Sequence, residues 1–174
     1  MPVGIGYDVH RLVGGRRLVL GGVEFESERG LQGHSDADVA LHAIMDALLG
    51  AAALGDIGEH FPPNDQQYAN ASSLDLLRRV ASLLTRYQWQ VGNVDVTIVA
   101  ERPKVGPRVP QMRECIGAAI GIDPSQVSVK ATTNEGMGFV GRGEGIAAFA
   151  VAEIVRIDPS PNRLTSSERS KRRG

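Results

Sequence analysis

The sequence predicts an α/β (α+β) two-layer sandwich, with one mixed sheet and helices on one face of it. Two observations support this fold class. The expected elements follow the order strands, helix, helix, strand, helix, strand and strand, and no segment repeats. The last expected strand, residues 145–157, is apolar on both faces, so the sheet face away from the helices also needs a cover. A sheet of another subunit would provide it, and we therefore expect an oligomer.

The first part of the chain predicts short strands followed by a buried helix. The strands, joined by glycine turns at Gly14-Gly15 and Gly21-Gly22, are expected over residues 3–12, 17–20 and 23–25. A helix then runs from Ala37 to about Ala53, with Ser35 or Asp36 as its expected N-cap. This helix is apolar nearly all round, so we expect it to be buried on two sides.

The second part predicts two more helices and three strands around two loops. Residues 55–70, rich in Gly, Pro, Asn and Asp, predict a long loop, and such loops in compact domains often have a function. One expected helix begins at Ser72 or Ser73 and ends near Tyr87, and another has Pro107 and Pro110 in its first turn and ends at Gly121. Strands are expected over residues 94–100, 127–132 and 145–157. A glycine-rich loop is expected over residues 136–145.

The length and composition are those of one ordinary globular domain, expected over residues 1–157. The 174 residues are 42% hydrophobic and 22% charged. They contain no apolar run long enough to cross a bilayer, and no basic segment precedes an apolar one at the N-terminus. The single cysteine, Cys115, excludes an internal disulfide framework and suits a reducing compartment. We expect a cytoplasmic protein without a membrane partner.

Residues 158–174 form a basic tail. They include five basic and two acidic residues and almost no apolar ones, so burial cannot offset the entropy of ordering them. We expect this tail to be disordered and solvated. Five spread charges without interleaved aromatic residues make a poor nucleic-acid footprint, and we expect no nucleic-acid partner.

Asp8, His10 and His42 are the most informative polar residues of the chain. Asp8 and His10 are two apart on an expected strand and therefore point to the same face. A histidine from the expected helix would complete a set of one carboxylate and two imidazoles, with which a catalytic zinc keeps one position open. The alternatives are a polar strand pair satisfied by hydrogen bonds and a histidine satisfied in the core.

Asp38 and Asp46 favour the metal site over these alternatives. They lie one helical turn before and after His42 on the same face, and either could orient its imidazole as an outer carboxylate. Their alternative role is as capping or exposed groups, which we expect more for Asp36.

Two further segments carry groups that suit phosphates. The hydroxyls and backbone amides of Thr132 and Thr133 suit phosphate oxygens and Glu135 suits Mg²⁺, although the segment could also be a helix-capping turn. In residues 136–145 the glycines allow close backbone approach and Arg142 could clamp an anion, although a mobile turn would have the same composition. The sequence has neither a Walker A loop nor a dinucleotide fingerprint.

Five segments of the chain together carry a family resemblance. They are Gly6-Tyr-Asp-Val-His-Arg-Leu12, Gly33-His-Ser-Asp-Ala-Asp-Val-Ala-Leu-His42-Ala-Ile-Met-Asp-Ala-Leu-Leu-Gly50, Gly55-Asp-Ile-Gly58 with His60-Phe-Pro62, Asn93-Val-Asp-Val-Thr-Ile98, and Gly138-Phe-Val-Gly-Arg-Gly-Glu-Gly145. They resemble the 2-C-methyl-D-erythritol 2,4-cyclodiphosphate synthase family of the non-mevalonate isoprenoid pathway. The resemblance covers about residues 2–157 in order and without large gaps.

The resemblance implies an enzyme, a phosphorus–oxygen lyase. The family converts 4-diphosphocytidyl-2-C-methyl-D-erythritol 2-phosphate to 2-C-methyl-D-erythritol 2,4-cyclodiphosphate and releases CMP. The nucleophile is the substrate's own 2-phosphate, so no side chain becomes covalent and the protein acts by positioning and charge neutralisation. Family members are homotrimers whose sheets pack around the trimer axis, with an active site at each subunit interface. The chain begins close to its first expected strand, so we expect a stand-alone enzyme rather than half of a fused cytidylyltransferase.

The resemblance also implies roles for single residues. The metal and catalytic groups are Asp8, His10 and His42 for one zinc per subunit, Glu135 for a second divalent cation (Mg²⁺ or Mn²⁺), and His34 and Thr133 for assistance to the transition state. The erythritol segments include Asp56, Ile57, Gly58, Phe61 and Asp65. The cytidine pocket of a neighbouring subunit includes Ala100, Lys104, Val105, Gly106, Ala131 and Thr132. Further substrate contacts are Asp8, Val9, His10, His34, Ser35, Thr133, Asn134, Glu135, Phe139 and Arg142. The family's central cavity, where Arg142 lies, can hold an isoprenoid diphosphate.

Two other functions stay open at this point. A zinc-dependent phosphohydrolase could use the same ligands to activate water, and its product would be linear rather than cyclic. A non-enzymatic trimer that binds an isoprenoid diphosphate, with a purely structural zinc, would leave His34 and Glu135 without a task. The resemblance favours cyclisation over both.

Overall fold

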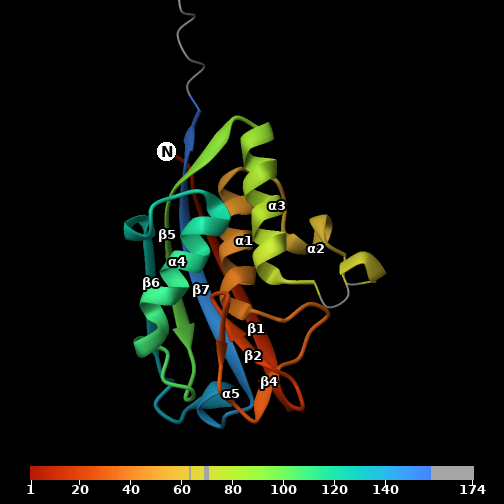
Figure 1. The fold of residues 1–174 in the computed structure, drawn as a ribbon, viewed down its shortest axis with the longest axis vertical. Coiled ribbons are helices and arrows are strands. Elements are labelled where there is room, and N and C mark those ends of the chain that lie inside the picture. The colour runs from red at the N-terminus through yellow and green to blue at the C-terminus, as the bar shows by residue number, and fades with distance from the viewer. Residues whose placement is uncertain (63, 69–70, 158–174) are drawn as a thin grey trace, which may run out of the picture.

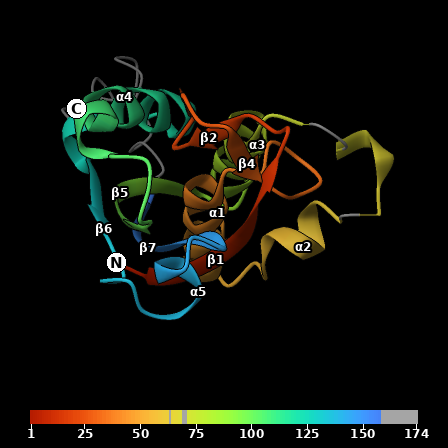
Figure 2. The same ribbon diagram turned by 90° about the horizontal axis from the view of Figure 1, so that it is seen from below.

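The computed structural model describes residues 1–62, 64–68 and 71–157, and its secondary structure forms two layers (Figure 1). The helices lie on one face of a five-stranded sheet, as the view from below also shows (Figure 2). In spatial order the strands are β4 (Arg29–Leu31), β1 (Val3–Gly14), β7 (Gly145–Arg156), β5 (Trp89–Val99) and β6 (Val127–Thr132). The covering helices are α1 (Val39–Ala51), α3 (Ser73–Arg86) and α4 (Val109–Ile120). The fold class expected from the sequence is confirmed.

The sheet is mixed, and its central strand is β7. This strand pairs antiparallel with β1 on one side and with β5 on the other, whereas β5 and β6 are parallel. The parallel pair requires a crossover connection, and α4 provides it. β1, β5 and β6 therefore run in the same direction. Val9 of β1, Ala147 of β7, Val99 of β5 and Thr132 of β6 lie side by side in one row across the sheet. The end of β6 is therefore level with the middle of β1.

The helix α1 is the central element of the core. All of its residues except Asp46 and Gly50 are buried, because it packs on β1 and β7 on one side and on α3 on the other (Figure 1). This confirms the expectation that a helix apolar nearly all round is buried on two sides.

Glycines bring β1 unusually close to α1. A Cβ atom on Gly4 would lie 2.0 Å from the carbonyl oxygen of Ala47, and one on Gly6 would lie 1.9 Å from the carbonyl oxygen of Ala43. Only glycine allows this approach. Asp8 and His10 continue the same face of the strand, so they too point toward α1.

Most expected elements are confirmed, with some differences at their ends. The two-residue turn Gly21-Gly22 joins β2 (Leu18–Leu20) to β3 (Val23–Phe25), and both glycines have positive φ, as a type I′ hairpin requires. Ser72 is the N-cap residue of α3, and Gly121 ends α4 in the left-handed conformation. The strand expected from residue 94 begins at Trp89, because its first half pairs with the end of β7.

Several local expectations were wrong. The N-cap of α1 is Asp38 and not Ser35 or Asp36, because Asp38 alone of the three accepts hydrogen bonds from the amides of Ala40 and Leu41. Pro107 lies in a 3₁₀ turn before α4 rather than in the first turn of the helix. The other differences are β4, which was not expected, and two short helices inside expected loops, α2 (Ile57–His60) and α5 (Gly138–Gly141). Each has three or four residues, too few for a recognisable period.

The face of the sheet opposite the helices carries exposed apolar side chains. They come from alternate positions of β1 and β7 and are Val3, Ile5, Tyr7, Val9, Phe149 and Val151. The rings of Tyr7 and Phe149 pack together, with centroids 4.7 Å apart. We refer to these six residues as the apolar sheet face. A row of this size on one sheet is typical of a surface that another protein layer covers.

Within the described ranges, no helix is long and apolar enough to cross a membrane. The tail over 158–174, expected to be disordered, lies outside the described residues.

Candidate metal centre

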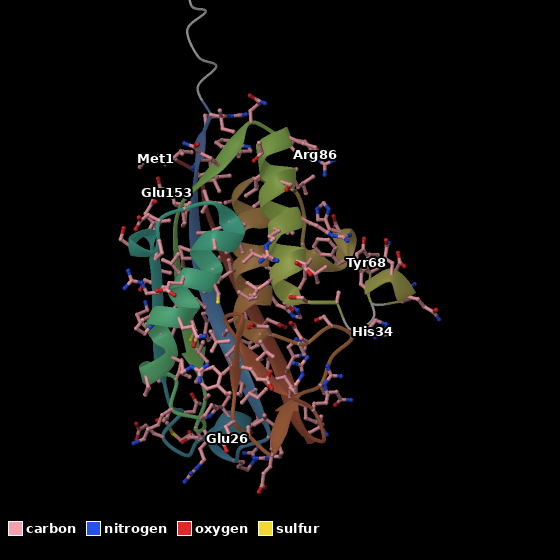
Figure 3. All side chains as sticks on the ribbon, viewed as in Figure 1. Met1, Glu26, His34, Tyr68, Arg86 and Glu153 are labelled. Carbon is pink, nitrogen blue, oxygen red and sulfur yellow. The ribbon has the colours of Figure 1, made fainter. Side chains whose placement is uncertain are left out.

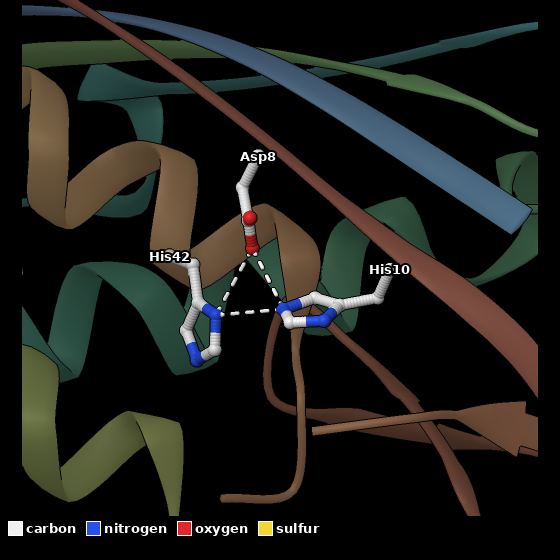
Figure 4. A group of neighbouring side chains, drawn as sticks. All are labelled: Asp8, His10 and His42. Atoms are coloured by element: carbon white, nitrogen blue, oxygen red, sulfur yellow. Dashed lines mark hydrogen bonds and ion pairs between the residues drawn. The ribbon is translucent and has the colours of Figure 1, made fainter. Parts of the chain in front are cut away.

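Asp8, His10 and His42 meet between β1 and α1, as the sequence predicted (Figure 4). Asp8 Oδ2 lies 2.9 Å from His10 Nε2 and 3.0 Å from His42 Nδ1. The two imidazole nitrogens are 3.1 Å apart. In the described part of the chain, this triad is the one group of three His, Cys, Asp or Glu side chains whose donor atoms converge in this way.

The backbone explains why these three side chains converge. Asp8 and His10 lie on the β1 face that approaches α1 through Gly4 and Gly6. His42 lies in the first turns of α1, one residue before Ala43, whose carbonyl oxygen marks the closest approach. The same glycine contacts that pack the strand against the helix therefore bring the imidazole of His42 to the carboxylate of Asp8.

The donor set suits zinc. One carboxylate and two imidazoles are the ligands of a three-residue catalytic site. Tetrahedral zinc ligands at about 2.0–2.2 Å from the ion lie about 3.3 Å apart, so these donor atoms would need to separate by only a few tenths of an ångström. The side chains of Asp8 and His10 are 22% and 19% exposed, so the triad opens to solvent on one side. A further ligand could enter there.

The carboxylate of Asp8 and the imidazole of His42 also stabilise each other's charged forms. Burial acts to raise the pKa of Asp8, but the hydrogen bonds and charges of His10 and His42 outweigh it and hold the pKa well below its usual range. Burial acts to lower the pKa of His42, and Asp8 reverses this effect, so that the pKa is raised. In the absence of a metal, the carboxylate of Asp8 therefore favours a proton on the neighbouring ring.

The expectation that Asp38 or Asp46 orients His42 was wrong. The carboxylate of Asp38 is fully buried and accepts hydrogen bonds from four backbone amides, those of Gly21, Gly22, Ala40 and Leu41. Burial raises the pKa of Asp38 to about 6, although the amides of Gly22, Gly21 and Leu41 act to lower it. The carboxylate of Asp46 accepts from the amide of Ile57 and so ties α2 to α1. The helical period placed both aspartates near His42 but could not show that backbone amides compete for them.

Two serines contact the outer nitrogen of His42 instead. Nε2 lies 3.0 Å from the hydroxyl of Ser73 and 3.2 Å from that of Ser35. Ser73 is the first residue of α3, and its hydroxyl is hydrogen-bonded to Asp36. The sequence had suggested Ser73 only as the start of a helix. Since it lies 31 positions from His42, no local pattern could have identified this contact.

The exposed His34 lies on the loop between β4 and α1, on the outside of the molecule (Figure 3). Arg16 fixes this loop, because its guanidinium donates to the carbonyl oxygens of Gly33 and Ser35, on either side of His34. The side chain of Val9 points away from the triad, to the apolar sheet face. A substrate contact of Val9 on the metal side could therefore involve only its backbone.

The loop after β6 holds Glu135 in a strained conformation. Glu135 has a φ of 51°, in the left-handed region, and its carboxylate accepts a hydrogen bond of 3.1 Å from the hydroxyl of Thr133. Glu101 supports this loop by accepting from the amides of Asn134 and Gly136. The expected cation ligand and the expected catalytic threonine are therefore adjacent and exposed.

A pocket of about 300 Å³ lies beside this loop. It is lined by the residues expected to bind cytidine, namely Ala100, Lys104, Val105, Gly106, Ala131 and Thr132, and also by Glu101, Pro103, Pro107 and Thr133. The parallel pairing of β5 with β6 brings these segments together, because both follow the same ends of the two strands. The structure thus assembles residues that are about 30 positions apart in the sequence.

The residues expected around the erythritol moiety lie on and after α2. Asp56 is the N-cap of α2, and its carboxylate accepts from the amide of Glu59. Phe61 packs edge to face against Tyr68, and Asp65 accepts from the amide of Gln67. Ile57 and Gly58 form the first turn of α2, which Asp46 holds against α1. These residues stand on the triad side of the molecule, because α1 carries both Asp46 and His42.

Arg142 and Phe139 lie at the α5 turn. Nε of Arg142 donates to the carboxylate of Glu144, 2.7 Å away, so an anion would share or compete for this guanidinium. Phe139 is 38% exposed. Arg142 also lines a larger pocket of about 870 Å³, together with Glu26, Glu28, Arg29, Glu101 and Lys104. The segment 136–145, predicted to be a glycine-rich loop, is partly helical, because it contains α5.

The triad and the pocket of about 300 Å³ beside the loop after β6 do not meet within one chain. We refer to this pocket as the cytidine-type pocket, after the group that the sequence predicts for it. Asp8 on β1 is in register with Ala148 on β7, Ile98 on β5 and Ala131 on β6. Three strand spacings of about 4.8 Å separate β1 from β6, or about 14 Å. The intervening strands β7 and β5 lie between the two groups.

Comparisons with known proteins identify the family. The YgbB family model matches residues 1–155. The 2-C-methyl-D-erythritol 2,4-cyclodiphosphate synthase of Symbiobacterium thermophilum is 70% identical over 154 residues, which cover 88% of this chain and 98% of that protein. The bifunctional enzyme IspD/IspF of Anaeromyxobacter dehalogenans is 61% identical over 156 residues, which cover 90% of this chain and 40% of that enzyme.

Solved structures give the same result. The bifunctional IspDF from Campylobacter jejuni aligns with a TM-score of 0.86 at 37% identity, over 89% of this chain and 42% of that chain. The CDP complex of IspF from Plasmodium falciparum aligns with a TM-score of 0.78 at 33% identity, over 89% of this chain and 96% of that chain. The chain therefore belongs to the YgbB family, together with proteins named 2-C-methyl-D-erythritol 2,4-cyclodiphosphate synthase.

Proposed function

We propose that this chain is a metal-dependent lyase of non-mevalonate isoprenoid precursor biosynthesis. It cyclises 4-diphosphocytidyl-2-C-methyl-D-erythritol 2-phosphate to 2-C-methyl-D-erythritol 2,4-cyclodiphosphate and releases CMP. The observation that carries this proposal is the converged triad of Asp8, His10 and His42. It occurs in a chain that is 70% identical to a protein named 2-C-methyl-D-erythritol 2,4-cyclodiphosphate synthase.

Asp8, His10 and His42 would hold one zinc ion, and Glu135 a second divalent cation, Mg²⁺ or Mn²⁺. When bound, these cations supply Lewis-acid polarisation of the diphosphate and neutralise the charge that develops as CMP leaves. The donor set supports zinc at the triad, and the exposed carboxylate of Glu135 suits a cation that keeps water and phosphate ligands.

The remaining site residues would position the substrate. His34 and Thr133 offer donors to the phosphates, and Arg16 fixes the backbone on both sides of His34. Lys104 lines the cytidine-type pocket and adds positive charge there. The similar Plasmodium falciparum structure is a CDP complex, which supports a cytidine nucleotide as the occupant of this pocket.

We further propose that the chain forms homotrimers with an active site at each subunit interface. Two observations support this assembly. The apolar sheet face is uncovered in one chain, and three strand spacings, about 14 Å, separate the β1 strand of the triad from the β6 strand of the cytidine-type pocket. A neighbouring copy could bring its cytidine-type pocket to the triad of the first. An isoprenoid diphosphate in the central cavity, near Arg142, and a cytoplasmic location belong to the same proposal.

The test is the identity of the product. Purified protein is incubated with the cytidylyl substrate, zinc and Mg²⁺, and the products are followed by phosphorus NMR. We expect CMP together with a cyclic diphosphate, whose two phosphorus atoms couple to each other. A linear product would indicate a phosphohydrolase, and unchanged substrate would indicate a binding protein. Either result would overturn the proposal.

A further inference from the structure

The two ring nitrogens of His42 face different partners. Nδ1 lies in the triad, 3.0 Å from Asp8 Oδ2. Nε2 points the opposite way, 3.0 Å from the hydroxyl oxygen of Ser73. A neutral imidazole has a proton on one nitrogen and a lone pair on the other, and only the lone pair can bind a metal. The partner of Nε2 therefore decides whether Nδ1 is available as a ligand.

Asp36 sets the direction of the hydrogen bond at Ser73. The side-chain oxygens of these two residues are hydrogen-bonded, and a carboxylate can only accept. The single hydroxyl proton of Ser73 is thus committed to Asp36, and the oxygen of Ser73 can only accept from Nε2. Asp36 also accepts from the backbone amide of Ser73 at 3.0 Å, which fixes the position of the serine. The direction from ring to serine to carboxylate holds a proton on Nε2, so Nδ1 is the nitrogen whose lone pair becomes available when a metal replaces the proton that faces Asp8.

Ser35 cannot set this direction. Its hydroxyl oxygen lies 3.2 Å from Nε2 and accepts from the amide of Ala37, and in the described part of the chain no carboxylate accepts its proton. Such a hydroxyl can either donate to Nε2 or accept from it. Ser73, His42 and Ser35 are all buried, so bulk water does not replace these contacts.

We propose that Ser73 and Asp36 are positioning residues for the metal centre, which hold His42 in the tautomer with its proton on Nε2 and its lone pair on Nδ1. The inference rests on the proposed zinc site. Neither residue would touch zinc or substrate. Asp36 lies before α1 and Ser73 begins α3, so the pair also locks the metal-binding helix to its neighbour.

The test compares the zinc affinity of matched variants. Ser73→Val and Ser73→Thr place the same added volume at a fully buried position, and only the threonine keeps a hydroxyl. Asp36→Asn retains a carbonyl oxygen for the amide of Ser73 but presents its NH₂ group to the serine hydroxyl, so that the hydroxyl would donate to Nε2. Ser72→Ala is the control, because the side chain of this neighbouring serine makes no capping hydrogen bond. Zinc affinity is measured by competition with a chromophoric chelator.

We expect Ser73→Val and Asp36→Asn to bind zinc about 10–100-fold more weakly than wild type. Ser73→Thr should bind more tightly than Ser73→Val, and Ser72→Ala should match wild type. Nitrogen NMR of the zinc-free protein should show a proton on Nε2 of His42 in wild type, whether or not Nδ1 also donates to Asp8, and should show Nε2 without a proton in Asp36→Asn. A merely structural role of Asp36 would not move this proton.

Unchanged zinc affinity in Asp36→Asn, with the proton still on Nε2, would overturn the proposal. Equal affinities of Ser73→Thr and Ser73→Val would do the same. If the serine variants fail to fold by circular dichroism, Asp36→Asn decides alone, because it changes no volume. Failure of wild type to bind zinc would instead contradict the proposed metal centre itself, so the two failures are distinguishable.

Discussion

Asp8, Asp36 and Asp38 show how single residues carry charge in a mostly apolar region. Each carboxylate is met by donors: two imidazoles at Asp8, a serine and two amides at Asp36, and four amides at Asp38. Burying a charge without such partners would cost several kcal/mol. The types of partner separate the roles, because only Asp8 faces side chains that can also bind a metal.

The first prediction concerns the triad. Asp8→Ala or His42→Ala removes one of three zinc ligands, and we expect loss of bound zinc and of CMP release with the assembly retained. Metal content is measured by atomic emission spectrometry, turnover by phosphorus NMR and assembly by light scattering. Ser82→Ala, on the exposed side of α3, is the control. Wild-type turnover in a variant without zinc would contradict the proposed role of the triad.

The second prediction concerns the pH dependence of stability through Asp38. Its pKa is raised from the ordinary 3.8 to about 6, so between these values the folded protein binds more protons than the unfolded chain. The contribution of Asp38 to the free energy of unfolding therefore falls as the pH rises from about 4 to about 6. Asp38→Asn does not titrate, so the stability of wild type relative to this variant should fall over that interval.

Urea unfolding of both proteins at several pH values between about 4 and 7 provides the measurement. Effects of titrating groups that Asp38 does not influence are common to both proteins and cancel in the difference, whereas the charge of Asp38 also helps to raise the pKa of His42. A difference that stays constant, or that rises with pH, would show that the pKa of Asp38 is not raised.

At the scale of elements, the packing of β1 against α1 creates the metal centre. The sequence was sufficient to predict both elements and the faces on which Asp8, His10 and His42 lie, since the periods of strand and helix determine these. It could not predict that Asp38 also accepts from the amides of Gly21 and Gly22 or that Ser73 meets His42. Both contacts depend on the tertiary fold, which brings Gly21 and the start of α3 to the N-terminus of α1.

The third prediction tests this packing with two glycines. A Cβ atom on Gly6 would collide with the carbonyl of Ala43, so Gly6→Ala should destabilise the protein by several kcal/mol and weaken zinc binding. A Cβ atom on Gly50, in α1 itself, would meet nothing closer than 4.0 Å. Gly50→Ala should leave stability unchanged or raise it by up to about 1 kcal/mol.

Thermal unfolding and zinc titration of both variants provide the measurement. Both substitutions add the same methyl group, so a difference between them isolates the contact between β1 and α1. Equal stabilities of Gly6→Ala and Gly50→Ala would show that this close approach does not hold the two elements together.

In the rest of the site, too, the sequence could predict features that follow from local patterns but not those that depend on tertiary contacts. The loop after β6 was recognised from Thr133 and Glu135, but Glu101 was not singled out as a site residue. Its role as the anchor of that loop depends on the parallel pairing of β5 with β6. The short elements α2, α5 and β4 could not be predicted, because three or four residues do not establish a period.

At the scale of the whole molecule, the fourth prediction concerns the apolar sheet face. Val151 lies on β7 opposite Ile5 on β1, and both are exposed. Val151→Asp places a charge in the proposed interface, where it would have to be buried without a partner. We expect wild type at about 56 kDa, three chains of 18.6 kDa each, and the variant at the mass of one chain.

Light scattering after size-exclusion chromatography measures this mass. Ser82→Asp introduces the same charge on the exposed helical layer and should leave the assembly intact. A Val151→Asp protein that keeps the wild-type mass would show that this face is not the interface. A folded monomer without CMP release would support a site that requires two copies.

The central claim is that each active site combines the triad of one copy with the cytidine-type pocket of the next. Two variants with different tags test it: Asp8→Ala, and Thr133→Ala combined with Glu135→Ala. In a cyclic trimer of mixed composition, one of the three interfaces pairs an intact triad with an intact pocket. Co-expression and purification through both tags isolate such mixed trimers.

CMP release by these mixed trimers, followed by phosphorus NMR, is the deciding measurement. Each variant alone should be inactive, and the mixed trimers should recover about one third of the wild-type rate, because about one site in three is complete. Mixed trimers as inactive as both parents would contradict the account, since they would show that triad and pocket must act within a single chain.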